Sequence, residues 1–166
     1  MYYFSYSYFL NRRAFFLTCP DASYLGLAEL SGYMLMFDGY SPLRRGAIAN
    51  IETSEDDEVW GCLYDVSQDN LDALDRFHGY PNHSKRSHLK VRSKATGENV
   101  EAWVYYHDPL AEGVPSHEYI RAVVKGARDS GIPEGYIDDW MRPFMRISDK
   151  FDSLESKDEG IGYKEY

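Results

Sequence analysis

Midway along the chain lies the segment that decides the fold, Leu74-Asp75-Arg76-Phe77-His78-Gly79-Tyr80-Pro81. Leu71, Leu74 and Phe77 recur at helical spacing, which predicts a helix over residues 67–77 with one apolar face. Ser67 can cap the start of this helix, and Gly79 suits its end because glycine adopts positive φ without strain. His78 is therefore expected at a helix C-terminus, at the point where the chain turns.

The residues on either side of this helix are rich in β-forming side chains. Runs of such residues, bounded by glycine or acidic residues, predict strands at 2–8, 24–30 leading into 33–37, 46–51, 58–66, 86–94 and 99–107. An acidic turn at residues 55–57 is expected before the strand at 58–66, and Thr96-Gly97 indicates a hairpin. Strands first and helices inserted or appended are typical of an α+β fold, and short strands favour a small barrel.

Two helices are predicted after the last strand. Ser116 and Gly131 suit the ends of a helix over residues 116–130, whose core-facing side chains would be Ile120, Val123, Val124 and Ala127. Pro133 is well placed to start a final helix. The expected apolar stripe of that helix consists of Ile137, Trp140, Met141 and Phe144.

Bulk properties limit the function classes. The 166 residues fit one domain, expected at 1–147, followed by an acidic and mobile tail at 148–166. The net charge of −9 argues against nucleic acid as a partner and gives no help at anionic membranes. No apolar run has the length of a membrane span, and the N-terminus does not have the pattern of a signal peptide. Cys19 and Cys62 form no CxxC or disulfide-framework pattern, so a reducing cytoplasm is expected.

Several spaced segments, in this order, carry a family resemblance: Tyr3 to Leu10; Gly46 to Ile51 with Val59-Trp60-Gly61; Leu74-Asp75 with His78-Gly79; and Pro115 to Tyr119 with Gly126-Ala127, Gly131, Pro133 and Tyr136. Together they resemble the γ-glutamylcyclotransferase family, including the plant AIG2-like proteins. The resemblance covers residues 3 to 140 and implies a BtrG-like fold, a small mixed β-barrel with flanking helices and a cavity at one end.

The resemblance also implies a reaction and a site. Family members cyclise a γ-glutamyl group: the α-amine attacks the γ-carbonyl, releasing 5-oxoproline and an amino acid or amine. This intramolecular acyl transfer implies no cofactor and a small γ-glutamyl or related amide or amine as the partner. The loop whose backbone N–H groups contact substrate in the family corresponds here to Tyr3, Phe4, Ser5, Tyr6, Ser7 and Tyr8. The family's substrate-contacting tyrosine corresponds to Tyr119.

Two departures from the family pattern concern the chemistry. His78 occupies the position of the catalytic glutamate, and Ser7, Tyr8 and Phe9 replace Gly, Ser and Asn. A histidine can act as a general base at neutral pH, and a helix C-terminus would raise its pKa. Against this, an imidazole differs from a carboxylate in shape and does not attract the substrate's ammonium through charge. Asp75 and Glu118 are the carboxylates nearest in sequence to the site.

The sequence therefore leaves both the role of His78 and the function of the protein open. His78 is either the catalytic base or a residue that only lines the pocket. The protein is a γ-glutamylcyclotransferase-like enzyme, with altered or lost activity as one outcome, or a non-catalytic relative that binds a small metabolite, or a different transferase or lyase built on the same cavity. The spacing of His78, His83 and His88 does not favour a metal site. His83, His88, His107 and His117 are interpreted as surface or capping residues.

Overall fold

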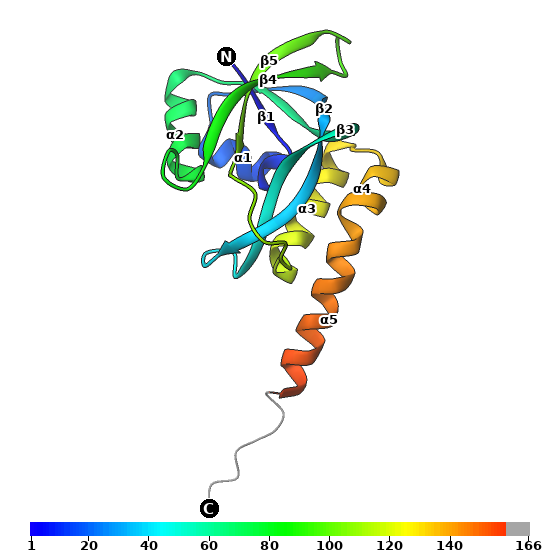
Figure 1. The fold of residues 1–166 in the computed structure, drawn as a ribbon. Helices are drawn as coiled ribbons and strands as arrows, with labels where there is room; N and C mark the ends of the chain where they lie inside the picture. The colour runs from blue at the N-terminus through cyan, green and yellow to red at the C-terminus, as the bar shows by residue number, and fades with distance from the viewer. Residues whose placement is uncertain (159–166) are drawn as a thin grey trace, which may run out of the picture.

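A closed barrel forms the centre of the molecule (Figure 1), with strand order β1-β3-β2-β4-β5. The computed structural model describes residues 1–158. Strand β1 pairs antiparallel with β3 and parallel with β5, so the barrel is mixed. This confirms the predicted α+β class and the small mixed barrel. The strands are β1 (Tyr2–Ser5), β2 (Ser23–Ser41), β3 (Gly46–Asp65), β4 (Lys85–Ser93) and β5 (Asn99–Tyr106).

Helices flank the barrel on two sides. In Figure 1, α1 and α2 lie on one side and α3, α4 and α5 on the other, with α5 extending away from the barrel. Their bounds are η1 (Tyr8–Leu10, a 3-10 turn), α1 (Arg12–Thr18), α2 (Gln68–His78), α3 (His117–Ser130), α4 (Glu134–Trp140) and α5 (Arg142–Asp158).

The helix caps expected from the sequence are confirmed. The Ser67 hydroxyl accepts a hydrogen bond from the Asn70 N–H at 3.2 Å, and Gly79 ends α2 with φ of +68°. Ser116 caps α3 in the same way, and Gly131 ends it in the left-handed region. These signals are local, because a cap satisfies backbone groups within one turn of itself.

Two strand predictions are wrong in their extent. Residues 46–51 and 58–66 belong to one strand, β3, and no turn separates them. In the pairing with β2, Thr53 lies opposite Tyr33, and the next paired residue of β3, Glu58, lies opposite Ser31. The four residues of β3 between these pairs therefore face a single residue of β2, Gly32. The acidic residues 55–57 thus form an irregularity in the ladder instead of a turn. The first strand also ends earlier than expected, at Ser5, because the chain turns into η1.

The C-terminal helices differ from the prediction in two ways. The single expected helix is broken at Met141 into α4 and α5. Helix α5 then runs through Asp158, so residues 148–158 are helical where the sequence predicted a mobile tail, while 159–166 lie outside the described residues. Tertiary packing accounts for the first part of this continuation, because Met145 packs against the core and Ser148 is buried.

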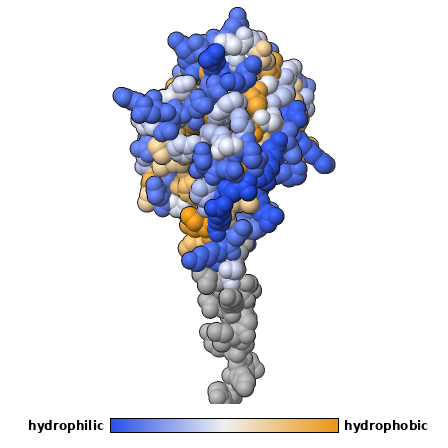
Figure 2. Space-filling view, turned by 90° about the vertical axis from the view of Figure 1, so that its right-hand side faces the viewer, coloured by the Kyte–Doolittle hydropathy of each residue, from blue (hydrophilic) through white to orange (hydrophobic). Residues whose placement is uncertain are grey.

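Aromatic side chains fill the core between the barrel and the N-terminal helices. Phe15 of α1 stacks on Tyr64 of β3 with ring centroids 3.7 Å apart, and the Tyr64 hydroxyl donates to the Phe9 carbonyl at 2.8 Å. The face of the molecule shown in Figure 2 is mostly hydrophilic, in keeping with the high content of charged residues. No helix among residues 1–158 combines the length and apolar character needed to cross a membrane.

Candidate active site

One cavity of about 740 Å³ brings together every site residue that the sequence predicted. Strand β1, the loop after it, the end of α2 and the start of α3 all contribute to its wall. The predicted residues that line it are Tyr3, Phe4, Ser5, Tyr6, Ser7, Tyr8, His78 and Tyr119. These residues are up to 116 positions apart in the sequence (3 to 119), so their meeting is a property of the fold; the role of each stays a prediction.

His78 reaches this cavity from the last residue of α2. Its ring stacks on Tyr105 with centroids 4.1 Å apart and an interplanar angle of 13°. Phe9 and Phe77 present their rings nearly at right angles to it, and Nε2 lies 3.3 Å from the Tyr3 hydroxyl. The imidazole therefore sits among aromatic rings, with one nitrogen already within hydrogen-bond distance of a phenol.

These surroundings reverse the electrostatic expectation for His78. The helix C-terminus was expected to raise its pKa, but burial among aromatic rings lowers the pKa to about 3. The expectation was wrong because the free-energy cost of removing the charged imidazolium from water exceeds the stabilisation that a helix C-terminus gives it. Burial also raises the pKa of Tyr3, so both partners of this contact are neutral near pH 7.

The altered loop after β1 folds without the glycine that the family pattern has. Ser7 has φ of −135°, outside the left-handed region that favours glycine. Phe9 is buried and does not line the cavity, whereas Tyr8 does, stacked on Phe77 with ring centroids 6.0 Å apart. The loop with Ser7 and Tyr8 thus forms one wall of the cavity, and the cavity remains open beside it.

A cation lies on this aromatic wall. The Arg44 guanidinium lies 4.0 Å from the ring centroid of Tyr8 and 5.5 Å from that of Tyr119. It comes from the turn between β2 and β3, lines the cavity, and has no carboxylate partner among the side chains that the structure describes. A guanidinium in this position is suited to bind a carboxylate. Sequence reasoning missed Arg44 because the turn lies more than thirty residues from either neighbour on this wall.

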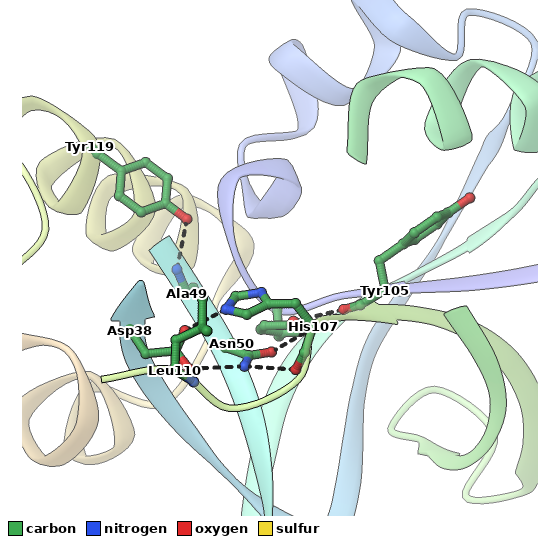
Figure 3. A network of polar contacts seen from close by, with 8 residues as sticks. Asp38, Ala49, Asn50, Tyr105, His107, Leu110 and Tyr119 are labelled. Carbon is green, nitrogen blue, oxygen red and sulfur yellow. Dashed lines mark hydrogen bonds and ion pairs between the residues drawn. The ribbon is translucent and has the colours of Figure 1, made fainter. Parts of the chain in front are cut away.

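The predicted tyrosines of the cavity are held by hydrogen bonds. Tyr119 accepts from the Ala49 N–H at 3.2 Å (Figure 3), and Tyr6 donates to the Tyr105 carbonyl at 2.7 Å. Burial raises the pKa of both phenols. Each hydroxyl therefore stays protonated near neutral pH, so the two tyrosines offer the cavity polar but uncharged groups.

His107 is the functional candidate that the sequence reading assigned wrongly. It was interpreted as a surface or capping residue, but it lines the cavity, and its Nε2 lies 2.5 Å from Oδ1 of the fully buried Asp38 (Figure 3). The sequence did contain a signal for a buried polar network at this place, because two polar residues occur within apolar strand segments. Asp38 follows Met-Leu-Met-Phe, and Asn50 lies within Ala-Ile-Ala-Asn-Ile. A buried polar group of this kind needs a partner.

The other carboxylates considered lie away from the cavity. Asp75 pairs with Arg86 at 2.9 Å and accepts from the Tyr105 hydroxyl at 2.6 Å, which is a structural arrangement. Glu118 is exposed and lines a neighbouring groove. Within residues 1–158, no three His, Cys, Asp or Glu side chains lie close enough together to hold a metal ion.

Comparison with known proteins gives one consistent result. The model of the AIG2-like family matches residues 58–140. The chain is 27% identical to the γ-glutamylcyclotransferase of Mus musculus and 28% identical to that of Homo sapiens, each over 141 residues that cover 81% of this chain and 73% of the relative. A solved structure named γ-glutamyl cyclotransferase superposes with a TM-score of 0.78 at 27% identity, covering 84% of this chain and 85% of the other.

Proposed function

Because the chain belongs to the AIG2-like family, we propose that it is a γ-glutamylcyclotransferase-like enzyme acting on a γ-glutamyl amine or amino acid. The reaction is an intramolecular acyl transfer that forms 5-oxoproline and releases the amine. It takes no cofactor, since nucleophile, electrophile and leaving group all belong to the substrate.

The observation that carries this proposal is the single cavity lined by all eight predicted residues. A γ-glutamyl chain is flexible, and it must be folded so that its α-nitrogen meets its γ-carbonyl. A pocket that holds the chain in this pose supplies the orientation, which can account for several kcal/mol of a barrier. The substrate-binding roles proposed for Tyr3, Phe4, Ser5, Tyr6, Ser7, Tyr8 and Tyr119 follow from their place in its wall.

Charge recognition is proposed for Arg44. The substrate's α-carboxylate needs a cationic or N–H partner, and this guanidinium lies at the cavity, 4.0 Å from the ring centroid of Tyr8. The backbone N–H groups of the loop at Ser5 to Tyr8 are the candidates for stabilising the oxyanion that develops on the γ-carbonyl.

A catalytic role for His78 is the step of the proposed reaction that the structure supports least. With a pKa of about 3 it is a poor acceptor for the proton of an α-ammonium, whose ordinary pKa is near 8. The transfer would be uphill by roughly five pKa units, on the order of 7 kcal/mol. This observation favours a second candidate function, a non-catalytic relative that binds a small metabolite in the same cavity.

One assay separates these two functions. The wild type and the variants His78→Ala and His78→Glu are incubated with a panel of γ-glutamyl amino acids and γ-glutamyl amines, and 5-oxoproline is measured. Release of 5-oxoproline by wild type supports the enzyme. Its absence in wild type with a gain in His78→Glu would identify an intact pocket that lacks a base. If all three are inactive and another metabolite binds, the binding function replaces the proposal.

A further inference from the structure

A buried carboxylate lies directly behind the cavity. Asp38 of β2 is fully buried, and both of its oxygens have partners: Oδ1 lies 2.5 Å from Nε2 of His107, while Oδ2 accepts from the Asn50 side-chain amide at 3.2 Å and from the Leu110 N–H at 2.9 Å (Figure 3). Donors on both oxygens suit an ionised carboxylate, which would be costly to bury without them.

The same network fixes the position of His107. The side chain of Asn50, fully buried on β3, donates to the His107 carbonyl and accepts from its N–H, both at 3.1 Å. The backbone of His107 is thus held from one side and its ring from the other. Three elements contribute to this arrangement: β2 supplies Asp38, β3 supplies Asn50, and the segment after β5 supplies the ring.

Of the three polar side chains in this network, His107 is the one that lines the cavity. His107 lines the cavity wall with a side chain that is 12% exposed, whereas Asp38 and Asn50 are covered. When Nε2–H donates to the carboxylate, Nδ1 is left with its lone pair. Nδ1 has no hydrogen-bond partner among the residues that the structure describes, and in Figure 3 the second ring nitrogen is turned away from Asp38.

We propose that His107, with Asp38 as its positioning residue, is the proton acceptor of this cavity and takes over the task of the glutamate that the family pattern has at position 78. This inference rests on the proposed cyclotransferase function. An acidic partner on one ring nitrogen stabilises the imidazolium that forms when the other nitrogen takes a proton. His78 has aromatic neighbours and the Tyr3 hydroxyl in place of such a partner.

The proton balance of the reaction fits one shuttling base. His107 takes a proton from the substrate's α-ammonium, and the freed amine forms a bond to the γ-carbonyl carbon. As the tetrahedral intermediate collapses, the bond from that carbon to the leaving nitrogen breaks, and His107 returns its proton to that nitrogen. The α-nitrogen loses two protons in becoming the lactam N–H, and the departing amine gains two in becoming an ammonium, so no other reactant is required.

A purely structural role would give a different experimental result. The network also ties the segment after β5 to the barrel, since Leu110 N–H donates to Asp38 and Gly39 N–H donates to the Ala111 carbonyl at 3.0 Å. If the contact between His107 and Asp38 were only structural, a substitution that breaks it would lower the unfolding temperature and weaken substrate binding. If His107 is the proton acceptor, a substitution that removes its imidazole lowers kcat and leaves KM nearly unchanged.

The test uses His107→Gln, whose amide can still donate to Asp38 but does not take a proton near pH 7, and His107→Ala with and without added imidazole. His88→Gln is the matched control, because His88 lies exposed on β4 against Trp103 and outside the cavity wall. We expect kcat for 5-oxoproline release to fall at least 100-fold in His107→Gln with KM within about threefold. Imidazole is expected to restore His107→Ala at least tenfold, and His88→Gln is expected to match wild type.

Each other outcome overturns a stated claim. A folded His107→Gln that keeps kcat within threefold of wild type overturns the inference and leaves the cyclotransferase proposal standing. No 5-oxoproline from wild type with any γ-glutamyl compound overturns the proposed function and this inference with it. If the variants do not fold, carbethoxylation of wild-type histidines followed by peptide mapping decides. Turnover must then fall in parallel with modification of His107, and full turnover with His107 modified overturns the inference.

Discussion

Two histidines that line one cavity show how far a residue's chemistry depends on its neighbours. His78 lies among Tyr3, Phe9, Phe77 and Tyr105, and burial there lowers its pKa to about 3. His107 faces the same space with a carboxylate behind it. An apolar ring environment penalises the imidazolium, whereas an adjacent anion supports it. The two imidazoles therefore differ in their surroundings, with aromatic rings around His78 and a carboxylate beside His107.

The low pKa of His78 predicts a pH dependence of stability. Its pKa is about 3 in the folded state and about 6.5 when unfolded, so between these values the unfolded chain binds the extra proton. The contribution to stability is therefore present above pH 6.5 and is lost as the pH falls towards 3. Relative to His78→Gln, wild type should lose on the order of 3 kcal/mol more between pH 7 and pH 4.

Urea unfolding at both pH values measures this difference directly. The comparison of wild type with His78→Gln cancels the effect of the carboxylates, which both proteins share. Parallel loss of stability in the two proteins would contradict the buried, neutral state of His78.

At the scale of elements, the site depends on how closely α3 approaches the loop after β1. Gly126 of α3 packs against the chain at Leu10 and Asn11, where an added Cβ would lie 2.6 Å from the Asn11 nitrogen and 2.8 Å from the Leu10 carbonyl carbon. Both are backbone atoms, which do not rotate away. This contact holds η1, and with it Tyr8, against the helix that carries Tyr119.

Two glycine-to-alanine substitutions test this contact. Gly126→Ala should destabilise the protein by about 1–3 kcal/mol, because the overpacked methyl group outweighs the gain in helix propensity. Gly135→Ala is the matched control in α4, where a Cβ meets nothing within 4 Å, and it should be neutral or stabilising by up to about 1 kcal/mol. The measurement is the urea midpoint of each variant, and equal effects of the two substitutions would refute the close approach.

At the scale of the whole molecule, the cavity wall brings together parts of the chain that lie far apart in the sequence. Its wall takes residues from β1, the β2–β3 turn, the end of α2, the end of β5 and the start of α3. A ligand that binds there contacts only the folded arrangement, since the wall does not exist in the unfolded chain. Binding must therefore stabilise the whole barrel.

A γ-glutamyl compound at about 100 times its Kd should raise the unfolding free energy by about 2.7 kcal/mol. For a chain of this size the expected increase in Tm is roughly 5–10 °C. Thermal unfolding of His107→Gln measures this without consuming the ligand, and the corresponding α-glutamyl isomer is the control. An equal shift with both isomers, or none with either, would argue against recognition of the γ-glutamyl group.

How much the sequence could predict follows from how local each signal is. The helix at α2 was located from Ser67 and Gly79, and the helix at α3 from Ser116 and Gly131, because capping residues act on backbone groups one turn away. The continuity of β3 through residues 55–57 was missed, since it depends on pairing with β2 opposite Gly32. The continuation of the helix through Ser148 was missed for the same kind of reason, because Met145 packs against the core and Ser148 is buried.

By itself, the sequence determined the α+β class, the helices at α2 and α3 with their caps, and, through the family pattern, which residues would meet in a cavity. Only the tertiary structure decided the chemistry inside that cavity: the neutral state of His78, the pairing of His107 with Asp38, and the place of Arg44 on Tyr8. The reason is that caps, turns and periodicity act within a few residues. Desolvation and charge pairing depend on side chains brought together from distant parts of the chain.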